Sequence, residues 1–451
     1  MGSYRPLLVV TLPLLFIVAA DATARPTARK DLRAAVGGHI RWKHLARRLT
    51  FLPPIVTDWL VSDPGMERVR EWLNKHGSTI GRRAAVAVAV GASLIAVLSL
   101  AQDHLIYFKR KYKGAGFYEE QRRAFDEFLG SIGRQPIQDI QFKDASIGHQ
   151  TAFLIPPRSS RVGTVVSPRS PLRLWVLFGG NAALALDWLE FVGVYLRRRV
   201  KAGKDDSGEE DDMAFLLADY PGYGECEGRP TPANTMKTSV QALDACLDSL
   251  SRHYSGPLPP IELNVFGHSI GAAAGLQLAL AVAQRLNHAG NPKPAYHSIS
   301  LGRLLLISPF TSLVDMATVV FPIIPTAVVE TLLVHKWDNR KRLTSLLDPH
   351  LWEDHVSDSA IPLTVMHGDR DEVVPVYMGR ELGGLAKTLT QQQPTPFATR
   401  YVEFAGADHN TLIWDNMADV LKAMDQPRPQ AACQSATGQN GGAACSNNGK
   451  L

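Results

Sequence analysis

Residues 261–276 read IELNVFGHSIGAAAGL and place Ser269 between two glycines. Apolar and β-prone residues come first, and small residues then lead into a long apolar segment, which predicts a strand followed directly by a helix. A turn this tight strains its central residue, and the flanking glycines leave room for the reversal and for the helix behind it. We therefore expect the Ser269 hydroxyl at a helix N-terminus, where developing negative charge is stabilised.

A serine needs a base, and the base needs an orienting acid, before it becomes a good nucleophile. Asp371 lies in the loop after an apolar run in VMHGDRDEVVP, and His409 lies in the loop after the next run in VEFAGADHNTL. The chain order Ser, Asp, His is the order that α/β-hydrolases use. The hypothesis is that His409 removes the Ser269 proton and later protonates the leaving group, while Asp371 fixes the imidazole tautomer.

Other side chains compete for these roles. Asp369 follows Gly368 at the strand end, and Asp408 precedes His409 directly, which places it badly for facing that ring. We interpret both as local turn or surface acids. Cys226 lacks a neighbouring histidine, so the pattern does not favour a thiol nucleophile.

An acyl-transfer site also needs donors for the oxyanion. The segment LFGGNAA (177–183) ends an early strand in a Gly-Gly-Asn turn. The backbone N–H groups of Asn181 and of Ile270, directly after the serine, are the expected pair. The loop DYPGYGECEGRPT (219–231) follows another strand, and lining the rim of the site and forming a purely structural turn remain equally open for it.

The surrounding pattern predicts an α/β fold. Two strands around a turn are expected at 137–157. Short runs rich in Val, Ile, Leu and Phe alternate with helical segments, which is typical of a doubly wound, mainly parallel sheet whose ligands bind beyond the carboxyl ends of the strands. The expected strands are 172–180, 214–222, 261–267, 303–310, 361–369 and 400–406, and the expected helices include 183–198, 235–253 and 271–287.

Composition narrows the classes of partner and cofactor. The 451 residues carry a formal charge of only +5, and no basic tract interleaved with aromatics indicates nucleic acid. The four cysteines lack both a disulfide framework and the spacing of zinc ligands. We expect no metal, no organic cofactor and no nucleic-acid partner.

The N-terminal quarter differs from the rest of the chain. The apolar run 6–20 and the small residues after it predict a signal-peptide-like segment over 1–24, although the Arg-rich, acid-poor region 25–83 also fits a transit peptide. Residues 84–101 carry no charge and predict a transmembrane helix, with a buried helix as the alternative. A single-pass endomembrane protein is expected, with an α/β-hydrolase domain over 115–425 and a disordered tail over 426–451.

Taken in order, the motifs of this chain resemble those of a known family. Its segments GGNAA, DYPGYGECEG, GHSIGAAAG, SPFTSLVDMA, HGDRDEVVP and GADHN line up in order with membrane-associated ABHD-type serine hydrolases, in the serine aminopeptidase and monoglyceride-lipase-like branch of the α/β-hydrolase superfamily. The resemblance implies Ser269, Asp371 and His409 as the triad and Asn181 and Ile270 at the oxyanion hole. One departure is Gly179, where many members carry His.

Three functions follow as alternatives. The first is a membrane-tethered hydrolase of an acyl ester or thioester, with a lipid or an acylated protein as substrate. The second is a serine peptidase of the same fold, and the third is a non-catalytic membrane scaffold. The apolar segment 311–334, which two prolines interrupt, is either a helix pair packed on the core or a small cap that lines an acyl channel.

Overall fold

The computed structural model describes Gln102 and the ranges 106–112, 115–158, 171–202, 213–254, 258–286, 296, 298–353 and 359–429. The predicted signal-peptide-like segment, the basic region, the transmembrane helix at 84–101 and the tail from residue 430 onward lie outside these residues. Within the described part of the chain, no helix combines the length and the apolar character that crossing a bilayer requires. The chain divides into two compact units, of which the larger comprises 109–316 and 337–451.

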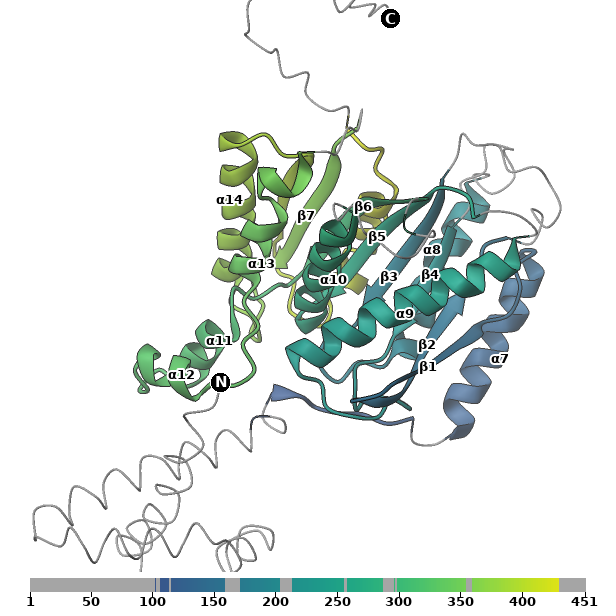
Figure 1. Cartoon of the computed structure of the whole chain (residues 1–451), viewed down its shortest axis with the longest axis horizontal. Coiled ribbons are helices and arrows are strands. Elements are labelled where there is room, and N and C mark those ends of the chain that lie inside the picture. Colours follow the sequence, from purple (N-terminus) through teal and green to yellow (C-terminus); the bar gives the residue numbers. More distant parts are fainter. Residues whose placement is uncertain are drawn as a thin grey trace, which may run out of the picture. The chain divides into compact units, whose positions relative to one another are not determined.

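An eight-stranded sheet forms the centre of the larger unit (Figure 1). Its spatial order is β1-β2-β4-β3-β5-β6-β7-β8. β2 pairs antiparallel with both β1 and β4, and every other neighbouring pair is parallel. This arrangement confirms the predicted α/β-hydrolase fold. The strands are β1 (Gln138–Asp144), β2 (Gly148–Ile155), β3 (Leu172–Phe178), β4 (Met213–Ala218), β5 (Ile261–His268), β6 (Ile299–Ile307), β7 (Ile361–Gly368) and β8 (Phe397–Phe404).

Burial explains why these apolar runs became strands of this kind. Every residue of β3 and of β7 is buried, because helices cover both faces of the sheet. In the last strand, β8, every residue after the buried Phe397 is half-buried or exposed, as in a strand at the sheet edge. Large fully buried side chains, among them Trp175, Phe215 and Phe266, fill the space between the layers.

Helices form a layer on each side of the sheet. α9, α10, α13 and α14 contact one another in sequence and lie in front of the sheet in Figure 1, whereas α8 and α16 lie behind it. The helices of the larger unit are α7 (Ala115–Ser131), α8 (Leu189–Lys201), α9 (Pro232–His253), α10 (Ile270–Leu286), α13 (Asn339–Leu346), α14 (Val376–Gln392), α15 (Leu412–Asp415) and α16 (Met417–Asp425), with short 3₁₀ turns η2 (Ala185–Trp188) and η4 (Pro349–Trp352).

Several predicted boundaries differ from the structure by a few residues: β4 is Met213–Ala218 against the expected 214–222, and β8 is Phe397–Phe404 against 400–406. β6 begins at Ile299, several residues before the expected 303. The helical segment expected from 183 begins only at Ala185, as a 3₁₀ turn that passes into α8. The cause is Leu184, whose φ of −100° and ψ of 157° are extended, so that the helix cannot begin before Ala185. Ala182, just before the expected start, has a left-handed φ of 66°.

The smaller unit contains 317–336 together with the described residues up to Phe108. α11 (Leu313–Val320) ends in this unit and α12 (Thr326–Leu332) lies wholly within it, with the break between them at the predicted prolines. The side chain of Gln102 is buried and binds the end of α12, because its amide donates to Leu332 O at 2.7 Å and accepts from Val334 N at 2.7 Å. Apolar side chains are exposed here: Val319, Val320, Phe321, Ile323, Val328 and Val334.

Candidate active site

Ser269 occupies the strained turn that the sequence predicts between β5 and α10. Its φ is 57°, and its N–H donates to Ile307 O at 2.8 Å, which holds this backbone against the end of β6. Neither flanking glycine could carry a side chain. A Cβ at Gly267 would collide with the Gly271 carbonyl, and one at Gly271 would collide with the Phe178 carbonyl. Close approach between backbones therefore explains the two glycines around the serine.

Asp371 and His409 meet although 38 positions separate them. They follow β7 and β8, which are parallel neighbours, so their loops leave the same sheet edge as Ser269. His409 Nδ1 lies 2.7 Å from Asp371 Oδ2, and both residues are buried. The other carboxylate oxygen, Oδ1, accepts from the N–H groups of Val373 at 3.0 Å and Val374 at 2.7 Å. The carboxylate is thus oriented by the backbone on one side and by the imidazole on the other.

The pKa of Asp371 reflects two opposing effects. Burial disfavours the carboxylate and raises its pKa. Hydrogen bonds from His367, His409 and Val374 N–H outweigh burial and hold the pKa of Asp371 well below its usual range. The acid is therefore ionised at neutral pH, as a partner for a histidine that gains a proton must be.

Two further histidines, which sequence reasoning missed, belong to this cluster. His367 is fully buried on β7, and its Nε2 lies 2.8 Å from Val374 O and 3.2 Å from Asp371 Oδ2. His268 precedes the serine, and its Nε2 lies 2.9 Å from His409 O. Each stands within a quoted motif, MHGD and GHS, but only the distances between loops reveal their contacts.

His268 also places His409 beside the serine turn. The two imidazole rings lie 4.8 Å apart at an angle of 39°. Burial, followed by the nearby His409, lowers the pKa of His268 to about 4, so this ring is neutral at physiological pH. The structure thus brings His409 and Asp371 together and sets His409 against the residue next to Ser269.

The turn after β3, where the oxyanion donor is expected, lies against the serine turn. β3 ends at Phe178, and a Cβ at Gly180 would lie 2.9 Å from His268 Nδ1 and 3.7 Å from Ser269 Cβ. The Asn181 side chain turns to Tyr223, whose hydroxyl donates to Asn181 Oδ1 at 2.8 Å. Ile270 is the first residue of α10, where N–H groups have no acceptor within the helix.

Neighbouring side chains occupy the space that a histidine at position 179 would need. A Cβ at this position would lie 2.7 Å from Trp188 Nε1 and 2.7 Å from Ala183 Cβ, so the indole fills the adjacent space. Tyr220 donates its hydroxyl to Gly179 O at 2.5 Å. Tyr220 and Tyr223 both lie in the loop 219–231, so this loop holds the turn after β3, where the oxyanion donor is expected.

The competing side chains have local partners. Asp369 Oδ1 accepts from Gly406 N at 2.6 Å, and Asp408 Oδ1 accepts from Asn410 N at 2.8 Å, as turn acids do. Burial raises the pKa of Cys226 to about 12, which keeps this thiol protonated. Across the described residues, no group of three or more His, Cys, Asp or Glu side chains is arranged to hold a metal ion.

Comparison with known proteins finds relatives that align with less than half of this chain. No protein-family profile matches the chain. An uncharacterized protein of Mycobacterium tuberculosis is 30% identical over 200 residues, which are 44% of this chain and 53% of that protein. The α/β-hydrolase domain-containing protein WAV2 of Arabidopsis thaliana is 26% identical over 199 residues, 43% of this chain and 53% of its own. The chain therefore spans about half the length of the curated relatives it matches.

A likeness is also found among solved structures. An esterase of Pyrococcus furiosus aligns with a TM-score of 0.39 and 12% identity, covering 67% of this chain and 94% of the esterase.

Proposed function

We propose that this chain, which belongs to the α/β-hydrolase superfamily, is a serine hydrolase that cleaves an acyl ester or thioester through an acyl-enzyme. One observation carries the proposal: His409 Nδ1 is held 2.7 Å from a buried, ionised Asp371, in contact with the strained turn that presents Ser269. A bond from Nδ1–H to the carboxylate leaves Nε2 unprotonated, which is the tautomer that can accept a proton from a serine hydroxyl.

The reaction proceeds in two halves. Ser269 Oγ attacks the acyl carbon as His409 Nε2 takes its proton, and the backbone N–H groups of Asn181 and Ile270 stabilise the resulting oxyanion. The C–O or C–S bond then breaks, and His409 gives the proton to the departing alcohol or thiol. Water attacks the acyl-enzyme in the second half, with His409 again as base, and the carboxylic acid leaves as Ser269 regains its proton.

The substrate class is a lipid or an acylated protein. The exposed apolar side chains of α11, α12 and the turn between them support this choice. Ile323 is 94% exposed and Val320 is 61% exposed, and contact with an apolar partner such as a lipid would remove these side chains from water. The predicted transmembrane helix at 84–101 would place the enzyme where lipid substrates reside. A peptidase of the same fold is the alternative, because the same triad also cleaves amides.

Covalent labelling tests the nucleophile. A fluorophosphonate probe should label the wild type, and Ser269→Ala should abolish labelling while circular dichroism stays unchanged. Ser308→Ala is a matched control, because Ser308 is also buried, follows a strand and has a positive φ of 46°. Its labelling should equal that of the wild type. Labelling of folded Ser269→Ala at the wild-type level would contradict the assignment.

Chain-length dependence tests the substrate class. Each methylene buried by the enzyme contributes about 0.8 kcal/mol, close to a fourfold gain in kcat/KM. The kcat/KM for p-nitrophenyl esters should therefore rise steeply from acetate toward longer chains. A profile that is flat or falls beyond short chains would favour a small or peptidic substrate.

A further inference from the structure

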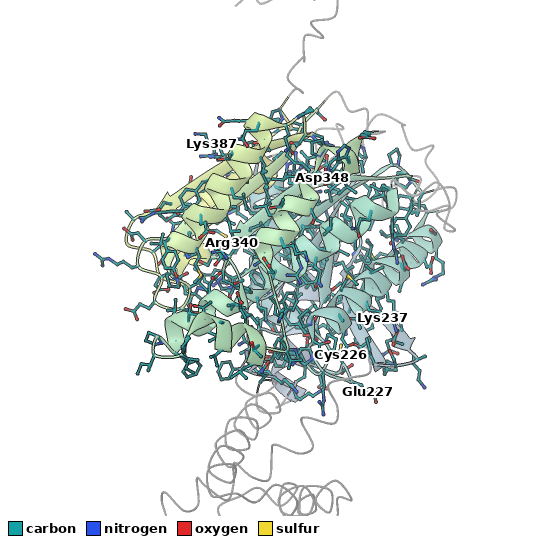
Figure 2. The ribbon with its side chains drawn as sticks, turned by 60° about the vertical axis from the view of Figure 1, so that its left-hand side comes forward. Cys226, Glu227, Lys237, Arg340, Asp348 and Lys387 are labelled. Carbon is teal, nitrogen blue, oxygen red and sulfur yellow. The ribbon has the colours of Figure 1, made fainter. Side chains whose placement is uncertain are left out.

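Residues 109–112 form an irregular segment that lies against two loops of the candidate site. Gly224 N donates to Arg110 O at 2.9 Å, and Lys111 Nζ donates to Cys226 O at 3.0 Å. Tyr112 donates its hydroxyl to Asp219 Oδ2 at 2.7 Å. All three partners belong to the loop 219–231, whose Cys226 and Glu227 are labelled in the lower part of the coloured ribbon in Figure 2.

Arg110, in the same segment, also forms hydrogen bonds with the turn after β3. One guanidinium nitrogen of Arg110, Nη1, donates to Ala182 O at 2.9 Å and to Asp187 Oδ2 at 2.8 Å. Asp187 Oδ2 in turn accepts from Leu184 N at 2.8 Å. Arg110 Nη2 donates to the Tyr118 hydroxyl at 2.7 Å, and that hydroxyl donates to Asp187 Oδ1 at 2.9 Å. Arg110 thus holds both ends of the turn 182–187.

The carbonyl that Arg110 binds belongs to Ala182, a residue with an unfavourable backbone conformation. Ala182 has a φ of 66°, which residues other than glycine adopt only when their surroundings enforce it. Ala182 O is bound by Arg110, and Ala182 N donates to Asn181 Oδ1 at 3.1 Å. Ala182 is therefore held at both its carbonyl and its N–H, and this restricts the backbone of the adjoining Asn181, whose N–H is the expected oxyanion donor.

We propose that Arg110 is a positioning residue for the oxyanion hole, which sets the Asn181 N–H by fixing the left-handed turn at Ala182. The inference rests on the proposed serine-hydrolase function. Arg110 lies outside the strands and helices of the fold, nine positions after the apolar run 84–101. The catalytic turn is therefore completed by the segment that leaves the predicted membrane helix, and not by the sheet alone.

Kinetics of the full-length protein test this role. Loss of a whole oxyanion donor lowers kcat about 10²- to 10³-fold, and a displaced donor should cost less. Arg110→Ala should lower kcat for p-nitrophenyl butyrate about 10- to 100-fold, with KM within about twofold of the wild type. The Ki of a trifluoromethyl ketone, whose tetrahedral adduct bears the oxyanion, should rise by the same factor as kcat falls. Methylguanidinium should restore part of the kcat.

Arg380→Ala is the matched control, because it removes an exposed arginine that forms a two-pronged ion pair with Glu403. Its kinetics should equal those of the wild type. If Arg110→Ala fails to fold, Asp187→Asn is the second variant. It weakens the hydrogen bonding between Arg110 and the turn 182–187 and should show the same loss of kcat. Arg110→Ala with wild-type kcat and Ki, or with a lowered melting temperature alone, would overturn the positioning role. A wild type without turnover and without probe labelling would refute the proposed function itself, and the positioning role with it.

Discussion

Replacing Asp371 by Asn tests the geometry of the acid most sharply. The carboxylate has one oxygen toward two backbone donors, Val373 N and Val374 N, and the other toward His409 Nδ1. An Asn side chain has a single acceptor oxygen, and the two N–H groups require it on their side. Its NH₂ group then faces His409 Nδ1 and donates to it, which forces the imidazole proton onto Nε2.

This change of tautomer fixes the expected magnitude. With its proton on Nε2, His409 cannot accept the proton of Ser269, so the general base is lost while the fold keeps its shape. The corresponding substitution in the Ser-His-Asp template lowers kcat by about 10⁴. Four factors of ten at about 1.4 kcal/mol each raise the barrier by about 5.5 kcal/mol.

The assay is kcat for p-nitrophenyl butyrate, with circular dichroism to confirm folding. Asp369→Asn is the control, because Asp369 accepts a bond from Gly406 N and makes no described contact with His409. It should keep kcat within about tenfold. If Asp371→Asn kept more than a tenth of wild-type kcat while Asp369→Asn lost it, Asp369 would be the orienting acid and the reasoning from the backbone donors would be refuted.

Three further outcomes are expected. Gly180→Ala should lower kcat more than it raises KM, because its Cβ would lie 2.9 Å from His268 Nδ1; an unchanged kcat would mean that this turn is not part of the site. Burial raises the pKa of Asp219 to about 6, so the folded protein holds this proton more tightly than the unfolded chain. The resulting stability is complete below about pH 4 and is lost as pH rises through 6. In urea unfolding, the wild-type free energy relative to Asp219→Asn should fall by about 2 to 3 kcal/mol between pH 4 and 7.5, and a constant difference would contradict the assignment. Deleting 1–101 should move the protein from the carbonate-resistant membrane fraction to the soluble one, and retention would reveal a second anchor.

Much of the fold follows from local pattern. The runs at β3, β5 and β7 are mainly apolar and almost wholly buried because both faces are covered, and this pattern alone predicts buried parallel strands. The Gly-His-Ser-Ile-Gly turn predicts a strained residue, and Ser269 has a positive φ. The positions of Asp371 and His409 after neighbouring strands follow in the same way, because the carboxyl ends of parallel strands meet at one edge.

The helix start after β3 was not predictable from the same pattern. The residues 183–188 are helix-compatible, yet Leu184 is extended and delays the helix to Ala185, after a turn in which Ala182 adopts a left-handed conformation. Arg110, which binds Ala182 O, lies 72 positions from it in the sequence, and Tyr223, which binds Asn181 Oδ1, lies 42 positions from Asn181. No local propensity contains that information.

The sequence by itself thus determined the order of strands and helices, the strained serine turn and the loops that carry Asp371 and His409, because periodicity and turn chemistry act over a few residues. Only the tertiary structure decided the spatial order in which β4 lies between β2 and β3, the contacts of His268 with His409 and of His367 with Asp371, and the hydrogen bond of Arg110 to Ala182 in the turn after β3. Those features depend on distances between loops far apart in the chain, and such distances exist only once the sheet has brought the strand ends together.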